Sequence, residues 1–185
     1  MLKEIYHDTE NRMNKTLEAL GRELTGIRTG KATTNILDAI KVDYYGTLTP
    51  LKQVASVAAP DPKQLVVQPW EKNLIPEIIK AIQKADLGLN PISESGIIRL
   101  PIPPLNEERR RDMVKLVKKF GEEAKVAVRN IRRDSIEALK KAEKDDKITE
   151  DELHLGQKHL QDSTDGHINK IDKLLEAKEA EVMEV

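Results

Sequence analysis

Three stretches of the chain repeat apolar residues at spacings of three and four, the pattern of helices that each bury one face. The first helix ends near Arg28, and the second begins after Asn106, a good N-cap, and runs to about Lys144. The third begins at the capping box Thr149-Glu150-Asp151-Glu152. The expected buried stripes are Leu2, Ile5, Thr9, Met13, Leu17, Leu20, Leu24 and Ile27; Met113, Val117, Phe120, Ala124, Ala127, Ile131 and Ala138; and Leu153, Leu160, Thr164, Ile168, Ile171, Leu175 and Val182. Because each helix is apolar on one side only, the pattern predicts a long antiparallel three-helix bundle.

Between the first and second helices the pattern changes to short β-prone runs separated by glycine and proline. The expected strands are Ile40–Tyr45, Val54–Ala58, Leu65–Gln68 and Ile97–Leu100. One helix interrupts them, with Pro76 in its first turn and Leu87-Gly88 at its end. This segment predicts a small α/β domain inserted into the bundle, with no strand order assigned.

The chain leaves the bundle at Arg28-Thr29-Gly30-Lys31 and returns through Pro101-Ile102-Pro103-Pro104. Glycine takes positive φ at little cost, and prolines neither continue a helix nor pair in a central strand. We therefore predict a two-domain α+β protein: residues 1–30 and 105–185 form the bundle, and residues 31–104 form the inserted domain. Two hinges are expected near 29–31 and 101–105, at Thr29, Gly30, Lys31, Pro101, Pro103, Pro104 and Leu105. Such a double hinge favours a mechanical role over a chemical one.

Five glycines fall inside the predicted helices, where each costs up to about 1 kcal/mol relative to alanine. They are Gly21, Gly26, Gly121, Gly156 and Gly166. The simplest interpretation is neutral drift at exposed positions, with tertiary packing compensating for the lost helix propensity.

The sequence lacks the residues that several classes of function require. There is no cysteine, which excludes disulfides and thiolate chemistry, and no apolar run approaches the ~20 residues of a membrane span. The segment Gly26–Ala32 resembles a phosphate-binding loop, but its glycines are one residue too close and Ala32 lacks the hydroxyl that would hold Mg²⁺. The four histidines show no i,i+4 pair suited to a metal, and helix-surface imidazoles are expected. We predict a protein that is not an enzyme and carries no cofactor or metal.

The net charge of −1 conceals a separation along the chain. Residues 106–133 contain ten Lys or Arg against five Asp or Glu, whereas residues 134–185 contain eight against fifteen. The local charge therefore changes from about +5 to about −7. A polyanion would meet such a molecule in one preferred orientation.

Within the basic stretch, Arg129, Arg132 and Arg133 share one helical face, with Lys125 one turn earlier. A solvated face balanced by acidic residues such as Asp8 or Asp134 is the ordinary interpretation of such a run. The lack of an acidic residue within 126–133 favours nucleic acid instead, because phosphates would relieve the repulsion among the arginines. A second cluster, Arg109, Arg110 and Arg111, lies beside the hinge, and Arg28 is expected near it. Since aromatics are few, we expect duplex or folded RNA recognised by shape rather than by base stacking.

Five sequence blocks together resemble the bacterial ribosome recycling factor family over the whole chain. The blocks are Ile27-Arg28-Thr29-Gly30-Lys31-Ala32, Val42-Asp43-Tyr44-Tyr45-Gly46, Asp86-Leu87-Gly88-Leu89-Asn90-Pro91, Pro103-Pro104-Leu105 with Glu107-Glu108-Arg109-Arg110, and Val126-Ala127-Val128-Arg129-Asn130-Ile131-Arg132-Arg133. Two positions depart from the family pattern, since Lys31 replaces a common arginine and Asn106 a common threonine. Lys31 keeps the charge but loses the guanidinium fork, and Asn106 is still a sound N-cap.

The resemblance implies an L-shaped, tRNA-like fold and a role in splitting the post-termination ribosome into subunits with elongation factor G and GTP. It implies binding to ribosomal RNA of the large subunit across the aminoacyl and peptidyl sites, in the cytoplasm, by a monomer without a membrane partner. The residues expected to bind RNA are Arg129, Arg132, Arg133, Arg28, Lys31, Arg109, Arg110 and Lys125. The alternative is a helical scaffold or adaptor that binds a protein partner through its acidic third helix.

Overall fold

The computed structural model describes residues 1–184, and its chain forms two compact units. The first unit contains Met1–Ile27 and the chain from Arg110 onward, and the second contains Arg28–Arg109. The second unit is thus inserted into the sequence of the first. One unit is helical and the other contains a sheet, which confirms the predicted α+β class.

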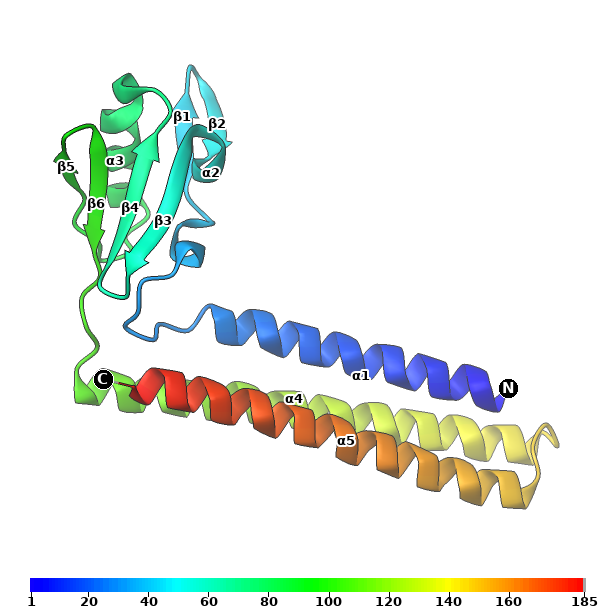
Figure 1. The fold of residues 1–185 in the computed structure, drawn as a ribbon. Helices are drawn as coiled ribbons and strands as arrows, with labels where there is room; N and C mark the ends of the chain where they lie inside the picture. Colours follow the sequence, from blue (N-terminus) through cyan, green and yellow to red (C-terminus); the bar gives the residue numbers. More distant parts are fainter. Residues whose placement is uncertain (185) are drawn as a thin grey trace. The chain divides into compact units, whose positions relative to one another are not determined.

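The first unit is a bundle of three long helices: α1 (Leu2–Thr25), α4 (Glu107–Lys144) and α5 (Glu150–Met183). Figure 1 shows the three helices side by side, with α1 and α5 running in one direction and α4 in the other. Two apolar clusters fill the bundle. One is centred on Met13, Val128 and Ile171, and the other on Leu139 and Leu160. Each cluster draws residues from all three helices, so no helix could bury its apolar face alone.

The predicted stripes describe the buried faces well except on α4, where Val128 is fully buried in place of the half-buried Ala127 and the end of the stripe is misplaced. Ala138 is exposed, whereas Ser135 and Leu139 are buried. Ala138 lines a groove between α1 and α4 that is open to solvent, so it lies at the margin of the core.

The predicted helix starts are confirmed by their hydrogen bonds. The side chain of Asn106 accepts a hydrogen bond from the Arg109 backbone N–H at 2.8 Å. Thr149 and Glu152 form the reciprocal capping box at the start of α5. Each cap satisfies amide groups that have no partner within the helix.

The interpretation of the helical glycines as drift is wrong for two of them. A Cβ at Gly121 of α4 would overlap the Leu175 side chain of α5, and a Cβ at Gly156 would lie 2.8 Å from a methyl carbon of Leu139. The missing side chains therefore allow α4 and α5 to approach closely. At Gly21 and Gly166 there is open space within 4 Å, as drift would require.

The expectation of surface imidazoles is wrong for His167, whose side chain is only 3% exposed. Its Nδ1 lies 2.7 Å from the Ser163 carbonyl oxygen and its Nε2 lies 3.0 Å from the Asn14 amide oxygen. Its ring is also 3.5 Å from the Glu10 carboxylate. His167 thus joins α5 to α1 through a buried polar contact, which the apolar periodicity of either helix does not reveal.

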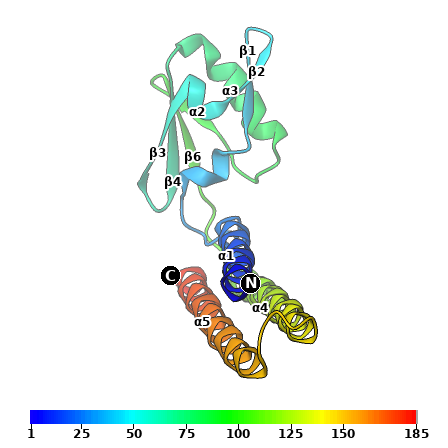
Figure 2. The ribbon, with the colours of Figure 1, turned by 90° about the vertical axis from the view of Figure 1, so that its right-hand side faces the viewer.

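The second unit is built on a four-stranded antiparallel sheet of order β3-β4-β6-β5. The strands are β3 (Ala55–Asp61), β4 (Gln64–Pro69), β5 (Ile92–Glu94) and β6 (Ile97–Pro101), and a separate hairpin pairs β1 (Lys41–Tyr44) with β2 (Thr47–Pro50). Helices α2 (Leu51–Val54) and α3 (Ile75–Lys84) lie on one side of the sheet (Figure 2), and short 3₁₀ turns span Thr34–Leu37 and Lys72–Leu74. The core between sheet and helices includes Leu65, Val67, Ile78, Ile82 and Ile98.

Three predictions for this unit are corrected. The helix with Pro76 in its first turn ends at Lys84 rather than at Leu87-Gly88, and Asp86 and Gly88 both have positive φ, which a helix cannot continue through. Strands β2 and β5 were not predicted, because neither alternates buried with exposed residues. Pro101 does pair in a central strand, opposite Gln64, at the end of β6 that β5 does not reach.

Candidate nucleic-acid interface

Four cationic side chains on one stretch of α4 form the predicted basic face, here defined as Lys125, Arg129, Arg132 and Arg133. The helix is continuous through all four residues, so their spacing places them on adjacent turns of one side. Arg129 and Arg133 are exposed, and Lys125 and Arg132 are half-buried. The bundle therefore presents them as one surface.

Two members of the basic face have acidic partners. Lys125 Nζ lies 2.6 Å from Asp172 of α5, and Arg129 lies 3.5 Å from Glu122, two turns earlier on α4. Neither acid falls within 126–133, so the local sequence did not indicate them. The Arg129 pair is exposed on both sides and contributes at most about 1 kcal/mol, so a phosphate can replace it readily.

Arg132 and Arg133 have no carboxylate partner among the described residues. An Nη of Arg132 donates to the Gln161 side-chain oxygen of α5, and its buried Nε has no hydrogen-bond acceptor in the described part of the chain. A buried donor without a partner costs free energy, and this Nε is closed to solvent, so an acceptor from outside would meet the Nη groups instead. The Gln161 contact also holds the guanidinium in one orientation, as bidentate phosphate binding requires.

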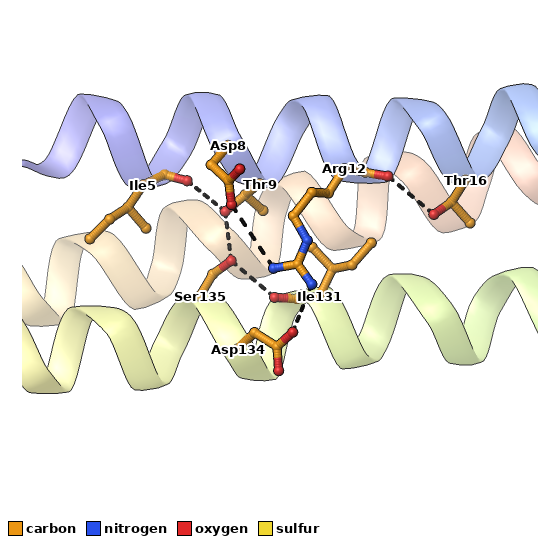
Figure 3. A network of polar contacts seen from close by, with 8 residues as sticks. All are labelled: Ile5, Asp8, Thr9, Arg12, Thr16, Ile131, Asp134 and Ser135. Atoms are coloured by element: carbon orange, nitrogen blue, oxygen red, sulfur yellow. Dashed lines mark hydrogen bonds and ion pairs between the residues drawn. The ribbon is translucent and has the colours of Figure 1, made fainter.

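The acidic residues that might have neutralised this face pair elsewhere. Asp134 lies 2.7 Å from Arg12 of α1, and Asp8 lies 3.9 Å from the same guanidinium. Figure 3 shows this network, with Thr9 and Ser135 hydrogen-bonded beside it at 2.6 Å. Both carboxylates therefore pair with Arg12 rather than with the basic face.

Two members of the second predicted cluster, Arg109 and Arg110, do not extend the basic face. At about 100° per residue, Arg109 is turned about 160° from Arg129 and Arg110 about 100°. By the same rule Arg111 and Lys118 share the direction of Arg129, so they continue the basic face along α4. Lys118 was not among the predicted residues, although its spacing of eleven residues from Arg129, about three turns, places it on the same side of the helix.

Arg28 makes an internal contact. Its guanidinium donates a hydrogen bond to the backbone carbonyl of Leu87, in the loop after α3. It also lies about 3.8 Å from where a Cβ at Gly88 would be. Lys31 follows in the same connector and is half-buried. Both residues belong to the second unit, whereas the basic face belongs to the first.

The remaining features suggest no reaction chemistry. A shallow groove of about 260 Å³ between α1 and α4 contains one hydroxyl, that of Ser135. This hydroxyl is hydrogen-bonded to Thr9 and to the Ile131 carbonyl, and no histidine of the described chain contacts it. Among residues 1–184 no group of three or more potential ligand side chains is placed to hold a metal ion. No helix in the same range is long and apolar enough to cross a membrane.

Comparison with known proteins gives consistent results along the whole chain. The family model described as "Ribosome recycling factor" matches residues 20–183. The ribosome-recycling factor of Halalkalibacterium halodurans is 54% identical over 185 residues, covering 100% of both chains. That of Oleidesulfovibrio alaskensis is 53% identical over 178 residues, covering 96% of this chain and 97% of the relative.

Two solved structures are also similar. A solution structure of a ribosome recycling factor has a TM-score of 0.78 at 43% identity and covers 100% of this chain and 98% of that one. The second is a model of the Thermus thermophilus ribosome recycling factor, described together with Escherichia coli elongation factor G bound to the post-termination complex. It has a TM-score of 0.66 at 46% identity over 100% of both chains.

Proposed function

Because this chain belongs to the ribosome recycling factor family, we propose that it acts with elongation factor G and GTP to split the post-termination ribosome into reusable subunits. Its role is that of a translation factor rather than a typical enzyme. The energy comes from the partner GTPase, and this chain supplies a binding surface and a stiff body. It works as a monomer in the cytoplasm, where the ribosomes are.

The bundle binds ribosomal RNA of the large subunit, across the aminoacyl and peptidyl sites, through the basic face. The observation that carries this proposal is the state of Arg132 and Arg133, which have no carboxylate partner among the described residues, while Asp8 and Asp134 are held by Arg12. RNA phosphates would supply the charge partners that Arg132 and Arg133 lack and would release counterions. Arg28, Lys31, Arg109 and Arg110 are secondary candidates, because the first three belong to the second unit and Arg110 is turned about 100° from Arg129 on α4.

The inserted domain, residues 31–104, moves relative to the bundle domain, residues 1–30 and 105–185. The bundle resists bending because its three helices pack around two apolar clusters along their length. We place the motion where the two connectors join the bundle; one connector contains Thr29, Gly30 and Lys31, and the other contains Pro101, Pro103, Pro104 and Leu105. A force applied to one domain by elongation factor G would then be transmitted without unfolding either.

The RNA assignment is tested by titrating the chain against large ribosomal subunits at several salt concentrations. Arg132→Ala and Arg133→Ala should each weaken binding and reduce the salt slope by about 1, the contribution of one phosphate contact. Lys80→Ala, an exposed cation of the second unit, is the matched control and should leave the slope unchanged. Wild-type affinity and slope in both arginine variants would contradict the assignment. A chain that ignored ribosomes at low salt would instead fit the scaffold alternative.

A further inference from the structure

Both connectors are hydrogen-bonded to the same turn of the second unit. The Ala32 backbone N–H donates to the Pro62 carbonyl, and the Ile102 N–H donates to the Lys63 carbonyl, each at 2.8 Å. Pro62 and Lys63 form the turn between β3 and β4. The outgoing and returning segments are therefore fixed to adjacent residues of one rigid hairpin.

The connectors also contact each other. A Cβ at Gly30 would lie 3.3 Å from the Leu105 backbone nitrogen and 3.4 Å from its Cγ. Gly30 has φ of +77°, a conformation that side chains other than glycine rarely adopt. Glycine is therefore required here for two reasons: the Leu105 backbone lies too close for a side chain, and φ is positive. Both reasons concern one fixed conformation of the connector.

Arg28 completes the attachment through its hydrogen bond to the Leu87 carbonyl. Thr29, the next residue, is only 7% exposed. The residue before Arg28, Ile27, is 6% exposed and belongs to the core of the helical bundle. Two consecutive residues, Ile27 and Arg28, are thus each held tightly, but by different units.

On the returning segment, the contact with the outgoing segment ends one residue before the cap of α4, the helix that continues into the first unit. Leu105 is packed against Gly30, and Asn106 caps the first turn of α4. The prolines between β6 and Leu105 fix their own φ near −65° and add stiffness. The segments 28–32 and 102–105 are defined here as the collar. They are restrained by hydrogen bonds to the second unit and by packing against each other.

We propose that Arg28 is a positioning residue that fastens the collar to the second unit, so that the units turn about two single junctions, Ile27–Arg28 and Leu105–Asn106. Gly30 and the prolines then move as part of the second unit. The biological role of this motion rests on the proposed function, whereas the attachment itself does not. Its test uses the free protein, so its failure and that of the ribosomal role are distinguishable.

The first measurement is amide hydrogen exchange of Ala32 and Ile102 by NMR. In the wild-type chain both amides should be protected to a degree similar to the sheet. Arg28→Ala removes a charge-assisted hydrogen bond and should accelerate exchange at Ala32 by roughly tenfold or more. Leu105→Ala, which empties the contact beneath Gly30, should accelerate exchange at both amides. Arg22→Ala is the control, because this exposed arginine of α1 has no side-chain partner among the described residues.

The second measurement follows the motion itself by single-molecule energy transfer. The chain has no cysteine, so Thr47→Cys and Lys158→Cys provide two exposed labelling sites, one in each unit. Arg28→Ala should broaden the distribution of transfer efficiencies relative to wild type and to Arg22→Ala. A change in protein stability alone would not broaden it under native conditions.

Three outcomes would overturn the proposal. Exchange of Ala32 and Ile102 at the rate of an unstructured peptide would mean that the collar is not braced. Unchanged exchange and transfer distributions in Arg28→Ala would mean that this residue does not fasten it. A lower salt slope for ribosome binding in Arg28→Ala, without any change in the free protein, would make Arg28 an RNA contact instead.

Discussion

Replacing Gly121 of α4 by alanine tests how closely the bundle helices approach each other. The added Cβ would overlap Leu175 of α5, and the crowding involves its Cγ as well as both methyl carbons. Rotation about χ2 moves only the methyls, so Leu175 cannot clear the space without a change of χ1 or a shift of the helix. Gly166, also within a bundle helix, has nothing within 4 Å of the corresponding position and provides a matched control.

The expected magnitude follows from two opposing effects. Alanine in place of glycine stabilises a helix interior by about 1 kcal/mol, which both variants gain. Overpacking at Gly121 costs about 1–3 kcal/mol, which only Gly121→Ala incurs. We therefore expect Gly166→Ala to be more stable than wild type by about 1 kcal/mol and Gly121→Ala to be destabilised by up to about 2 kcal/mol. Their difference measures the steric cost alone, since helix propensity cancels.

Thermal unfolding followed by calorimetry measures this difference. About 1 kcal/mol corresponds to roughly 2–4 °C for a chain of this size, so the two variants should be well separated. In a Leu175→Ala background the difference should largely disappear, and Gly121→Ala should become stabilising because the clash is gone. Equal stabilisation by both single substitutions would refute the close approach of α4 and α5.

Two further predictions concern local contacts. Thr149→Ala removes the capping box with Glu152 and should lower stability by about 1 kcal/mol, measured by urea unfolding; an unchanged midpoint would contradict the cap. The hydrogen bond from the Tyr44 hydroxyl to Glu71, followed by the charge of that carboxylate, raises the pKa of Tyr44. Any stability from this contact is present below the unfolded-state pKa of about 10 and is lost as pH rises through the raised value. Glu71→Gln should return the Tyr44 pKa towards its ordinary value in a spectrophotometric titration, whereas an identical curve would show that Glu71 is not the cause.

The helical unit was predictable because its signals are local. Buried residues of a long helix recur every three or four positions, and the caps at Asn106 and Thr149 are encoded within four residues. The same reasoning failed at Gly121, Gly156 and His167, whose surroundings come from other helices. Nothing in the sequence next to these residues indicates Leu175, Leu139 or Asn14.

The sheet and the basic face show the same limit. Strands β2 and β5 are short and largely exposed, so no alternation of apolar and polar residues marks them. The arginine cluster was identified from spacing alone, but the pairing of Lys125 with Asp172 and of Arg132 with Gln161 depends on how α5 packs against α4. Spacing thus located the positive charges, and only the tertiary structure showed which of them have a carboxylate partner.

We propose that this chain splits ribosomes with a partner GTPase through contacts of its basic face. The most direct measurement is light scattering of post-termination ribosomes after addition of the chain, elongation factor G and GTP. The account predicts a fall in scattering that requires all three components and is strongly reduced for Arg132→Ala. Scattering that stays constant with the wild-type chain, or falls equally with Arg132→Ala, would contradict it.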